Sequence, residues 1–283
     1  MTVASPTLDE LREDVARALG DVRAATPLVG SITNAITMDF VANAQLAAGG
    51  SAAMIYLPEE GVAMAAASGA LYLNLGALLP LHRDSIPAAA RACHDLGRPW
   101  VLDPVGIGIG SLREDILSEL RACKPTIVRG NASEVIALAR AWDLDDGPEQ
   151  GGEVRGVDAT DPVAAASRAA AALARWTGGA VAVSGPEDLV TGGRVAVSVT
   201  GGSPLMSRVT GFGCSLGGVL AVFAAVADPL TAAVAGTACY AAAGTRAAEG
   251  AQGPASFKVA FLDALYNLDA AALAAVPLTI EEA

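Results

Sequence analysis

The sequence predicts a three-layer α/β/α fold with a mostly parallel central sheet. Short apolar segments alternate with amphipathic segments along the chain. The apolar segments are continuous runs, as expected for strands that are covered on both faces. Polar residues or glycine follow these runs, at the strand ends where ligands bind in doubly wound folds. A chain of 283 residues can form one large α/β domain or two small ones, and we expect one domain over residues 1–283.

Glycine, proline and polar residues delimit the elements of the first half of the chain. Leu8, Leu11, Val15 and Leu19 share one helical face, and Gly20 follows, so the first helix is expected over residues 7–19. We expect strands at 27–34, 52–57, 71–76 and 100–106, and helices at 36–48, 62–68, 82–96 and 112–122.

The second half of the chain continues the alternation after one irregular segment. A strand at 125–131 runs directly into a helix at 132–142. The segment 144–161 is rich in glycine and aspartate, and loops of that length are usually functional or mobile. Beyond it we expect helices at 162–176, 219–226, 230–249 and 256–268 and strands at 180–184 and 194–199.

A glycine turn, Gly211-Phe212-Gly213-Cys214, precedes the apolar run at 219–226. Its glycines permit a tight turn with N–H groups exposed where a buried helix begins. Such a point binds anions and suits the negative charge of a transition state. Cys214 is expected in the first helical turn, where the helix N-terminus lowers a thiol pKa. An isolated G-x-G is more often a plain turn before a core helix, so this interpretation depends on other residues.

Composition argues against several classes of partner. The net charge is −12 without a basic stripe, and aromatic residues make up 4% of the chain, so we expect neither nucleic acid nor a membrane surface as partner. The first ten residues lack the apolar segment of a secretory signal. Four dispersed cysteines favour free thiols in the cytoplasm. Both histidines, His82 and His94, fall in a predicted surface helix, which argues against a histidine-based zinc site.

Two carboxylates follow neighbouring predicted strands. Asp103 and Glu134 are hard oxygen donors, and a carboxylate pair favours Mg²⁺ over Zn²⁺. Each also has a structural interpretation, since Glu134 in a first helical turn complements the helix dipole. Arg129 could pair with Glu134 or hold a phosphate with two hydrogen bonds. The glycine turn, the arginine and the carboxylate pair together indicate phosphoryl transfer.

The sequence resembles the hydroxyethylthiazole kinases, thiamine-salvage enzymes of the ribokinase-like fold. The resemblance covers nearly the whole chain, and the run Arg129-Gly-Asn-Ala-Ser-Glu134 is its most specific part. The matching segments are 27–34, Met54 with 58–60, 74–76, 102–106, 124–134, 156–158, 211–214 and 253–257.

The resemblance implies a role for each matching residue. Met54 and Gly211 match positions that contact the thiazole, and Arg129 and Ser184 match positions that contact ATP. Asp103 and Glu134 are similar to the carboxylates that arrange Mg²⁺. Cys214 stands where related sugar kinases carry a catalytic aspartate, beside the amides of Gly211 and Gly213. The family also implies a homotrimer with sites near subunit boundaries.

Two further polar residues at predicted strand ends are assigned to the site. We expect Asn34 beside the acceptor and Asn131 beside the nucleotide. The chain departs from the family at three positions, where Phe212 and Ser184 each replace a threonine and Gly30 replaces a histidine. We expect the Phe212 ring to point outward or into the core, since backbone N–H groups form the anion site. Gly30 is expected to affect a subunit contact or the pocket wall.

The resemblance therefore implies ATP- and Mg²⁺-dependent phosphorylation of 4-methyl-5-(2-hydroxyethyl)thiazole, and we expect Cys214 to accept the proton of the alcohol. Three alternatives remain open at this point. The chain could phosphorylate another small vitamin-precursor alcohol, or it could bind nucleotide without catalysis. It could also use Cys214 as a nucleophile, although neither histidine falls near a strand end to act as its base.

Overall fold

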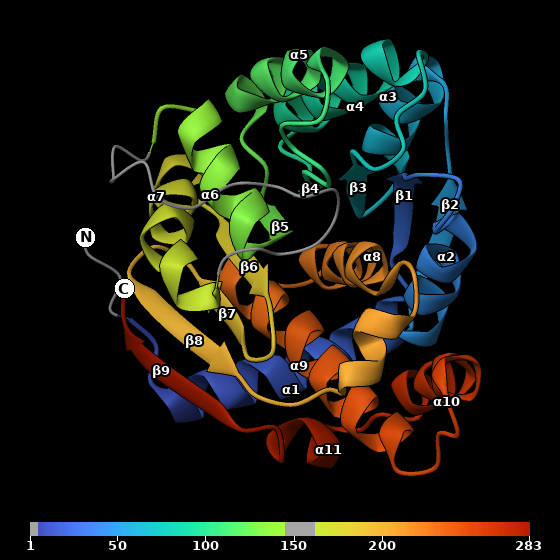
Figure 1. Ribbon diagram of the computed structural model, residues 1–283, viewed down its shortest axis with the longest axis vertical. Helices are drawn as coiled ribbons and strands as arrows, with labels where there is room; N and C mark the ends of the chain where they lie inside the picture. Colours follow the sequence, from blue (N-terminus) through green and yellow to red (C-terminus); the bar gives the residue numbers. More distant parts are fainter. Residues whose placement is uncertain (1–4, 145–161) are drawn as a thin grey trace.

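A computed structural model describes residues 5–144 and 162–283. Its core is a nine-stranded sheet with helices on both faces (Figure 1). The strands are β1 (Leu28–Ile32), β2 (Ser51–Met54), β3 (Ala70–Asn74), β4 (Trp100–Asp103), β5 (Ile127–Asn131), β6 (Ala180–Ser184), β7 (Asp188–Thr191), β8 (Val195–Val199) and β9 (Leu278–Glu282). Their order across the sheet is β2-β1-β3-β4-β5-β6-β7-β8-β9. Strands β1 to β6 are parallel, which confirms the predicted mostly parallel sheet.

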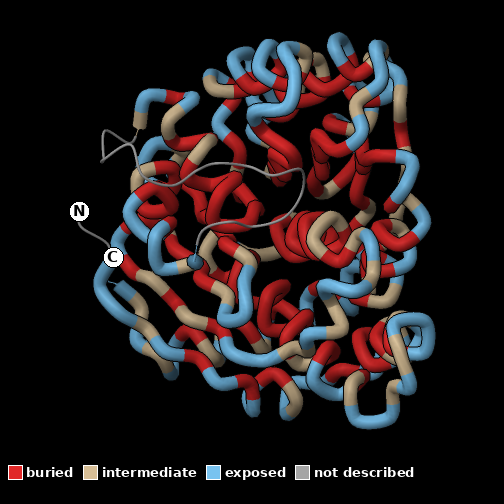
Figure 2. Tube along the Cα trace, in the orientation of Figure 1, coloured by how far each residue is buried: buried red, intermediate tan, exposed pale blue. Residues whose placement is uncertain are grey.

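The helices form two layers with separate apolar cores. They are α1 (Leu8–Ala25), α2 (Met38–Ala47), α3 (Pro58–Ala67), α4 (His82–Leu96), α5 (Ser111–Leu120), α6 (Ala132–Ala141), α7 (Ser167–Thr177), α8 (Phe212–Ala224), α9 (Pro229–Ala248), α10 (Pro254–Tyr266) and α11 (Ala270–Ala274). Helices α1, α2 and α8 to α11 share one core with the sheet, and α3 to α7 share the other. Figure 2 shows the buried residues concentrated along the strands and along α8. None of the described helices combines the length and apolar character that a bilayer-spanning segment needs.

The register of the sheet gathers the site residues on one face. Asn74 on β3 pairs with Asp103 on β4, and Asn131 on β5 pairs with Ser184 on β6. Side chains alternate between the faces of a strand. Val101 and Ile127 belong to the core on the α8 side, so Asp103 and Arg129, each two residues further along its strand, also face α8. The polar ends of four parallel strands therefore converge beneath this helix.

Three elements were not predicted from the sequence. Strands β7 and β9 and helix α11 are absent from the expected pattern, and β6 to β9 are joined by antiparallel pairing. β9 is a short segment in which Leu278 and Ile280 alternate with polar residues, and it pairs with β8. Helix α8 begins at Phe212, ahead of the apolar run at 219–226, so Cys214 lies in its first turn, as predicted. Apart from Leu144, the irregular segment 144–161 lies outside the described residues, as does the matching segment 156–158.

Candidate active site

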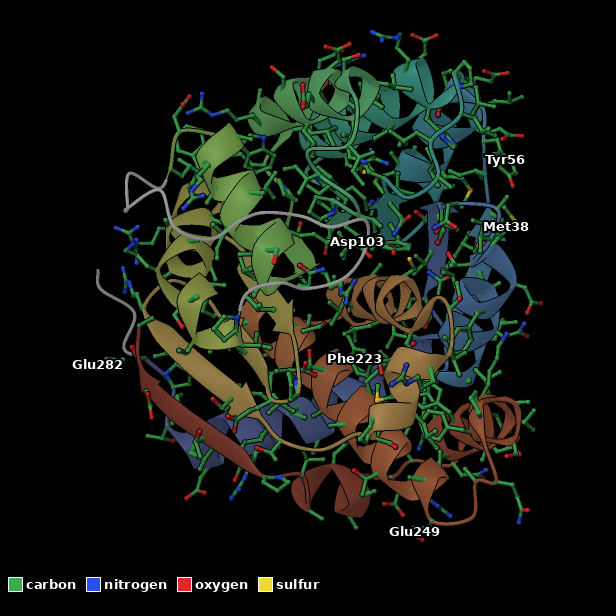
Figure 3. All side chains as sticks on the ribbon, in the orientation of Figure 1. Met38, Tyr56, Asp103, Phe223, Glu249 and Glu282 are labelled. Atoms are coloured by element: carbon green, nitrogen blue, oxygen red, sulfur yellow. The ribbon has the colours of Figure 1, made fainter. Side chains whose placement is uncertain are left out.

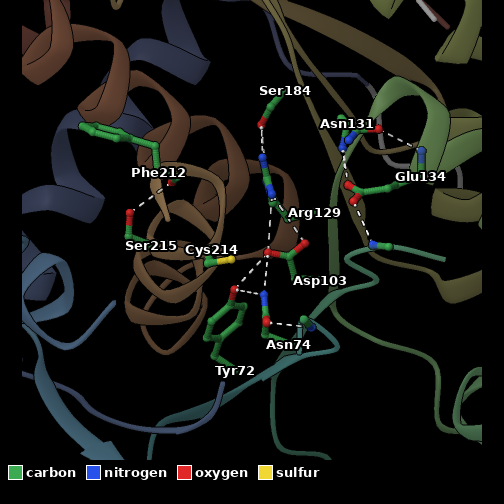
Figure 4. Close-up of polar contacts among 12 residues, drawn as sticks. Tyr72, Asn74, Asp103, Arg129, Asn131, Glu134, Ser184, Phe212, Cys214 and Ser215 are labelled. Atoms are coloured by element: carbon green, nitrogen blue, oxygen red, sulfur yellow. Dashed lines mark hydrogen bonds and ion pairs between the residues drawn. The ribbon is translucent and has the colours of Figure 1, made fainter. Parts of the chain in front are cut away.

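Asp103 is the centre of a buried polar network at the carboxyl end of β4 (Figures 3 and 4). It is fully buried, and its Oδ2 accepts hydrogen bonds from the Tyr72 hydroxyl at 2.9 Å and from Asn74 Nδ2 at 3.1 Å. An Nη atom of Arg129 lies 3.4 Å from each carboxylate oxygen. Burial raises the pKa of Asp103, while Arg129 and the hydrogen bonds oppose the increase. The network therefore holds a charge that water does not reach.

A chain of side-chain amides connects Asp103 to Cys214. Asn74 Oδ1 accepts from Asn34 Nδ2 at 3.0 Å, and the same Nδ2 lies 3.7 Å from Cys214 Sγ. Asn34 in turn is fixed by the backbone N–H of Thr37, which donates to its Oδ1 at 3.2 Å. The amide side chains are thus held by one another, and the predicted substrate residue Asn34 lies directly beside the predicted catalytic thiol.

Arg129 projects from β5 into the space between the sheet and the start of α8. Its Nε and one Nη donate to Ser184 Oγ at 3.3 and 3.0 Å, and its other Nη faces Asp103. Among the described residues its ion pair is with Asp103, whereas the sequence suggested Glu134. Burial lowers the pKa of Arg129, but Asp103 and the other negative groups around it raise the pKa by more, so the guanidinium is charged. Two predicted nucleotide residues, Arg129 and Ser184, are therefore in direct contact.

Glu134 is a structural cap as well as a candidate metal ligand. Its Oε2 accepts from the backbone N–H of Asn131 at 2.9 Å, and its own N–H donates to Asn131 Oδ1 at 2.9 Å. Its Oε1 accepts from the N–H of Gly106, in the loop after β4, at 3.2 Å. The capping interpretation of Glu134 is therefore correct, and Asn131 is the other half of the same capping box.

The two carboxylates fit a divalent cation that arrives with a nucleotide. Burial raises the pKa of Glu134, and the charge of Asp103 raises it further, so a cation between them would relieve this repulsion. Within residues 5–144 and 162–283, no three His, Cys, Asp or Glu side chains form a metal-binding group. Mg²⁺ commonly binds through one or two carboxylates together with phosphate oxygens, so a complete protein cage is not required.

The glycines of α8 allow the sheet and α2 to touch the helix backbone. A Cβ at Gly213 would lie 2.5 Å from both Nη atoms of Arg129, and one at Gly217 would lie 2.5 Å from Tyr72 Cε2. A Cβ at Gly211 would lie 3.0 Å from Thr37 Cγ2, and its φ of +96° is left-handed. Glycine at 211 is thus required by conformation, and glycine at 213 and 217 by close approach.

Phe212 packs into the core, as predicted. Its ring is 6% exposed, with centroids 4.7 Å from Phe261, 4.9 Å from Phe40, 5.6 Å from Phe257 and 6.5 Å from Tyr240. The ring therefore anchors the start of α8 in a cluster of aromatic side chains. It does not enter the polar network around Asp103.

Gly30 also faces the interior. A Cβ there would lie 2.6 Å from Leu71 Cδ2 and 3.1 Å from Met64 Cβ, on the sheet face covered by α3. The chain packs too tightly there for a histidine side chain, which the family commonly has at this position. The sequence predicted that Gly30 would affect a subunit contact or the pocket wall. The structure instead places it in the interior, against Leu71 and Met64.

The environment of Cys214 contradicts the predicted direction of its pKa. The thiol is only partly exposed, and burial is the main cause that raises its pKa, followed by the nearby charge of Asp103. Arg129 and the polar side chains around the thiol lower it by less. The helix N-terminus alone had predicted a decrease. Desolvation is the main effect here because the sheet encloses the first turn of α8.

His82 also differs from expectation. It is 2% exposed at the start of α4, whereas a surface position was predicted. Its Nδ1 accepts a hydrogen bond from the backbone N–H of Leu79 at 2.9 Å, and burial lowers its pKa. His82 therefore stabilises the loop that follows β3 by accepting this hydrogen bond.

Met54 ends β2 and packs against the core of the α8 side. Nearby, the Tyr56 hydroxyl donates to Met38 Sδ at 3.5 Å, and Figure 3 shows both residues at the β2 edge of the molecule. Met54 pairs in register with Ser31 of β1. The chain after β1 leads to Asn34.

Two residues near Asp103 and Arg129 were missed from the sequence. Tyr72 lies mid-strand in an apolar run and there reads as core. Asp188 begins the unpredicted strand β7; burial raises its pKa to about 6, and Arg129 lowers it by less. Tyr72 could have been found from its i, i+2 spacing to Asn74, which places both on one face.

Comparisons with known proteins point to a single family. The model of the "Hydroxyethylthiazole kinase family" matches residues 19–271. A hydroxyethylthiazole kinase from Bifidobacterium adolescentis is 50% identical over 277 residues, covering 95% of this chain and 94% of the relative. The structure of a hydroxyethylthiazole kinase protein from Pyrococcus horikoshii OT3 superposes with a TM-score of 0.83 at 32% identity, covering 96% of this chain and 99% of that one.

A more distant structure bears on the fold alone. A ribokinase-like superfamily protein from Enterococcus faecalis V583 superposes with a TM-score of 0.57 at 13% identity, covering 93% of this chain and 91% of that one. The predicted ribokinase-like fold is therefore confirmed.

Proposed function

The chain is an enzyme of the hydroxyethylthiazole kinase family, and from this premise we propose that it transfers a phosphoryl group from ATP to the alcohol of 4-methyl-5-(2-hydroxyethyl)thiazole in thiamine salvage. One observation carries the proposal. The guanidinium of Arg129 lies against the backbone of Gly213, at the start of α8, and Asp103 and Ser184 hold it there. A fixed cation beside helix N–H groups suits a triphosphate.

On the acceptor side, we assign Met54, Asn34 and Gly211 to the thiazole alcohol. The N–H groups of Gly211 and Gly213 would stabilise the transferring phosphoryl group. Cys214 lies at the reacting position and would take the proton of the alcohol. Only the thiolate can take that proton, so the raised pKa of Cys214 limits this role at neutral pH. A loose phosphoryl-transfer transition state needs little help from a base.

On the nucleotide side, we assign Arg129, Ser184 and Asn131 to ATP. Asp103 and Glu134 would hold Mg²⁺, which when bound offsets the charge of the triphosphate. Asn131 contributes by fixing Glu134 through the capping box. Asp103 in turn orients Arg129.

We also propose a cytoplasmic homotrimer in which residues 1–283 form one kinase domain. Large apolar side chains are exposed in the loops after four successive parallel strands, which supports an interface near the site. They are Ile36, Leu57, Leu79 and Ile109, with exposed fractions of 45% to 73%. Light scattering of the purified protein tests the trimer, and a monomer at micromolar concentration would exclude it.

The function is tested by ADP release over a panel of vitamin-precursor alcohols, with phosphorus NMR of the product. We expect the thiazole alcohol to give the highest kcat/KM and a phosphate monoester. A different preferred alcohol would redirect the proposal within the kinase class. Nucleotide binding without turnover on any alcohol would identify a non-catalytic family member. Stoichiometric acylation of Cys214 by an acyl donor would indicate a cysteine nucleophile.

A further inference from the structure

The phenol of Tyr72 sits inside the active-site network without reaching the surface. Its side chain is fully buried, and its hydroxyl donates to Asp103 Oδ2 and accepts from Asn74 Nδ2, both at 2.9 Å (Figure 4). A buried phenol needs such partners because an unsatisfied hydroxyl is costly. The same Asn74 amide also reaches Asp103, so the three side chains form a closed triangle.

The ring of Tyr72 also packs directly against the backbone of α8. A Cβ at Gly217 would lie 2.5 Å from Cε2, 2.8 Å from Cζ and 2.9 Å from the hydroxyl oxygen of Tyr72. Only glycine at 217 leaves room for this ring. The packing therefore fixes the hydroxyl relative to the helix that carries the glycine turn.

The triangle makes the two oxygens of Asp103 unequal. Oδ2 receives Tyr72 and Asn74 and also faces Arg129. Among the described residues Oδ1 has one hydrogen-bond contact, with an Nη of Arg129 at 3.4 Å. Rotation about the terminal torsion of an aspartate is broad and only weakly restrained by itself. Two short donors on one oxygen remove that freedom.

We propose that Tyr72 is a positioning residue, which commits Oδ2 of Asp103 to the protein and leaves Oδ1 for the nucleotide-bound cation. The inference rests on the proposed function in assigning Asp103 to Mg²⁺. Tyr72 touches neither substrate nor nucleotide in this role. Its effect is confined to interactions that pass through Asp103.

Substitution Tyr72→Phe tests the role because it removes one oxygen and keeps the ring on Gly217. Binding of a non-hydrolysable ATP analogue is measured by calorimetry with and without Mg²⁺. We expect the gain in affinity from Mg²⁺ to fall at least fivefold, while binding without metal stays within twofold of the unchanged protein. In turnover, kcat should fall while KM for the acceptor alcohol stays within twofold.

Tyr240→Phe is the matched control. Tyr240 is equally buried, and its hydroxyl takes no part in the hydrogen-bonded triangle of Tyr72, Asn74 and Asp103. Both binding constants should stay within twofold in this variant. A Mg²⁺ gain in Tyr72→Phe equal to that of the unchanged protein overturns the proposal. Equal weakening of binding with and without Mg²⁺ also overturns it, since that pattern marks a general structural loss.

A second variant, Gly217→Ala, moves the phenol without removing it. We expect it to reduce the Mg²⁺ gain as Tyr72→Phe does, and the double variant to be no worse than the more damaging single one. Fully additive losses would contradict a shared route through Asp103. The binding assay needs no acceptor alcohol, so absence of thiazole phosphorylation would reject the proposed function while this test still applies. Absence of any Mg²⁺ gain in the unchanged protein would overturn the inference itself.

Discussion

The guanidinium of Arg129 lies directly on the backbone of Gly213, with both Nη atoms 2.5 Å from the point that a Cβ at position 213 would occupy. The arginine comes from β5 and the glycine from the first turn of α8, so this contact joins the sheet to the anion-binding turn. Asp103 and Ser184 hold the guanidinium from the other sides. Glycine at position 213 therefore leaves room for the Arg129 guanidinium, in addition to any role in turning the chain.

Gly213→Ala should displace Arg129 and weaken nucleotide binding. The added methyl group takes the space of two nitrogen atoms that are already held by Asp103 and Ser184. We expect the affinity for an ATP analogue to fall at least tenfold, about 1.4 kcal/mol, in calorimetry. Gly20→Ala in α1 is the control, since a Cβ there meets no atom within 4 Å. Wild-type affinity in Gly213→Ala would show that the guanidinium can move aside freely.

Alkylation of Cys214 should require a higher pH than a free cysteine. Burial and Asp103 raise the pKa of the thiol, and iodoacetamide reacts with the thiolate. The rate, followed by mass spectrometry of the Cys214 peptide, should reach half its maximum above pH ~8.5, the ordinary thiol value. The other three cysteines are buried, and the alkylation of their peptides in the same samples is the internal reference. A midpoint at or below that pH would mean that the helix N-terminus outweighs desolvation.

Glu134→Gln should lower both stability and the apparent affinity for Mg²⁺. Both carboxylate oxygens accept backbone N–H groups, so the amide nitrogen of glutamine must face one donor. A lost cap costs about 1 kcal/mol, and loss of the negative charge should raise the Mg²⁺ concentration needed for half-maximal turnover. Glu60→Gln removes the charge of an exposed cap at α3, where one amide oxygen can still accept both N–H groups, and so controls for loss of charge at a cap away from the site. Unchanged Mg²⁺ dependence in Glu134→Gln would leave it a cap only.

Phe212→Thr should cost stability more than activity. The ring is buried among four aromatic side chains, so its removal should cost about 3 kcal/mol of unfolding free energy. We expect kcat/KM for the thiazole alcohol to change less than about tenfold, ~1.4 kcal/mol of barrier. Phe257→Thr, in the same cluster on α10, should show the same stability loss in urea unfolding. A gain of several hundredfold in kcat/KM would mean that Phe212 blocks the pocket.

Asp188→Asn should change how stability depends on pH. Burial raises the pKa of Asp188 from 3.8 to about 6, so the folded protein binds this proton more tightly than the unfolded chain. The contribution of Asp188 to stability is present below pH ~4 and is lost as the pH rises through ~6. The variant should therefore gain stability relative to the wild type between these values, by at most about 3 kcal/mol before screening by water reduces it.

Urea unfolding at pH 4, 5, 6 and 7 measures this difference. Asparagine can still accept the N–H of Gly185, which donates to Asp188 Oδ1 at 2.8 Å. Glu187→Gln removes one negative charge from the adjacent residue and is the matched control. A stability difference that is constant across the four pH values would show that Asp188 has no raised pKa.

The sequence was most informative where the physics is local. Apolar runs and their glycine or proline boundaries predicted β1 to β6, β8 and most of the helices, because strand and helix periodicity depends on neighbouring residues. The run from Arg129 to Glu134 identified the family, and Asp103, Arg129, Ser184 and Cys214 were placed at strand and helix ends by their position in the pattern. For the Phe212 ring the sequence left two positions open, outward or in the core, and the structure places it in the core.

Only the tertiary structure decided which partners these residues have. β9 is only five residues long and pairs with β8, more than 70 positions away in the chain. The register of β3 against β4 brings Tyr72 and Asn74 to Asp103, and the register of β4 against β5 brings Arg129 to it. The pKa of Cys214 is raised, whereas the sequence predicted that it would be lowered. A sequence shows that a helix begins near a residue, but desolvation depends on the elements that enclose that residue.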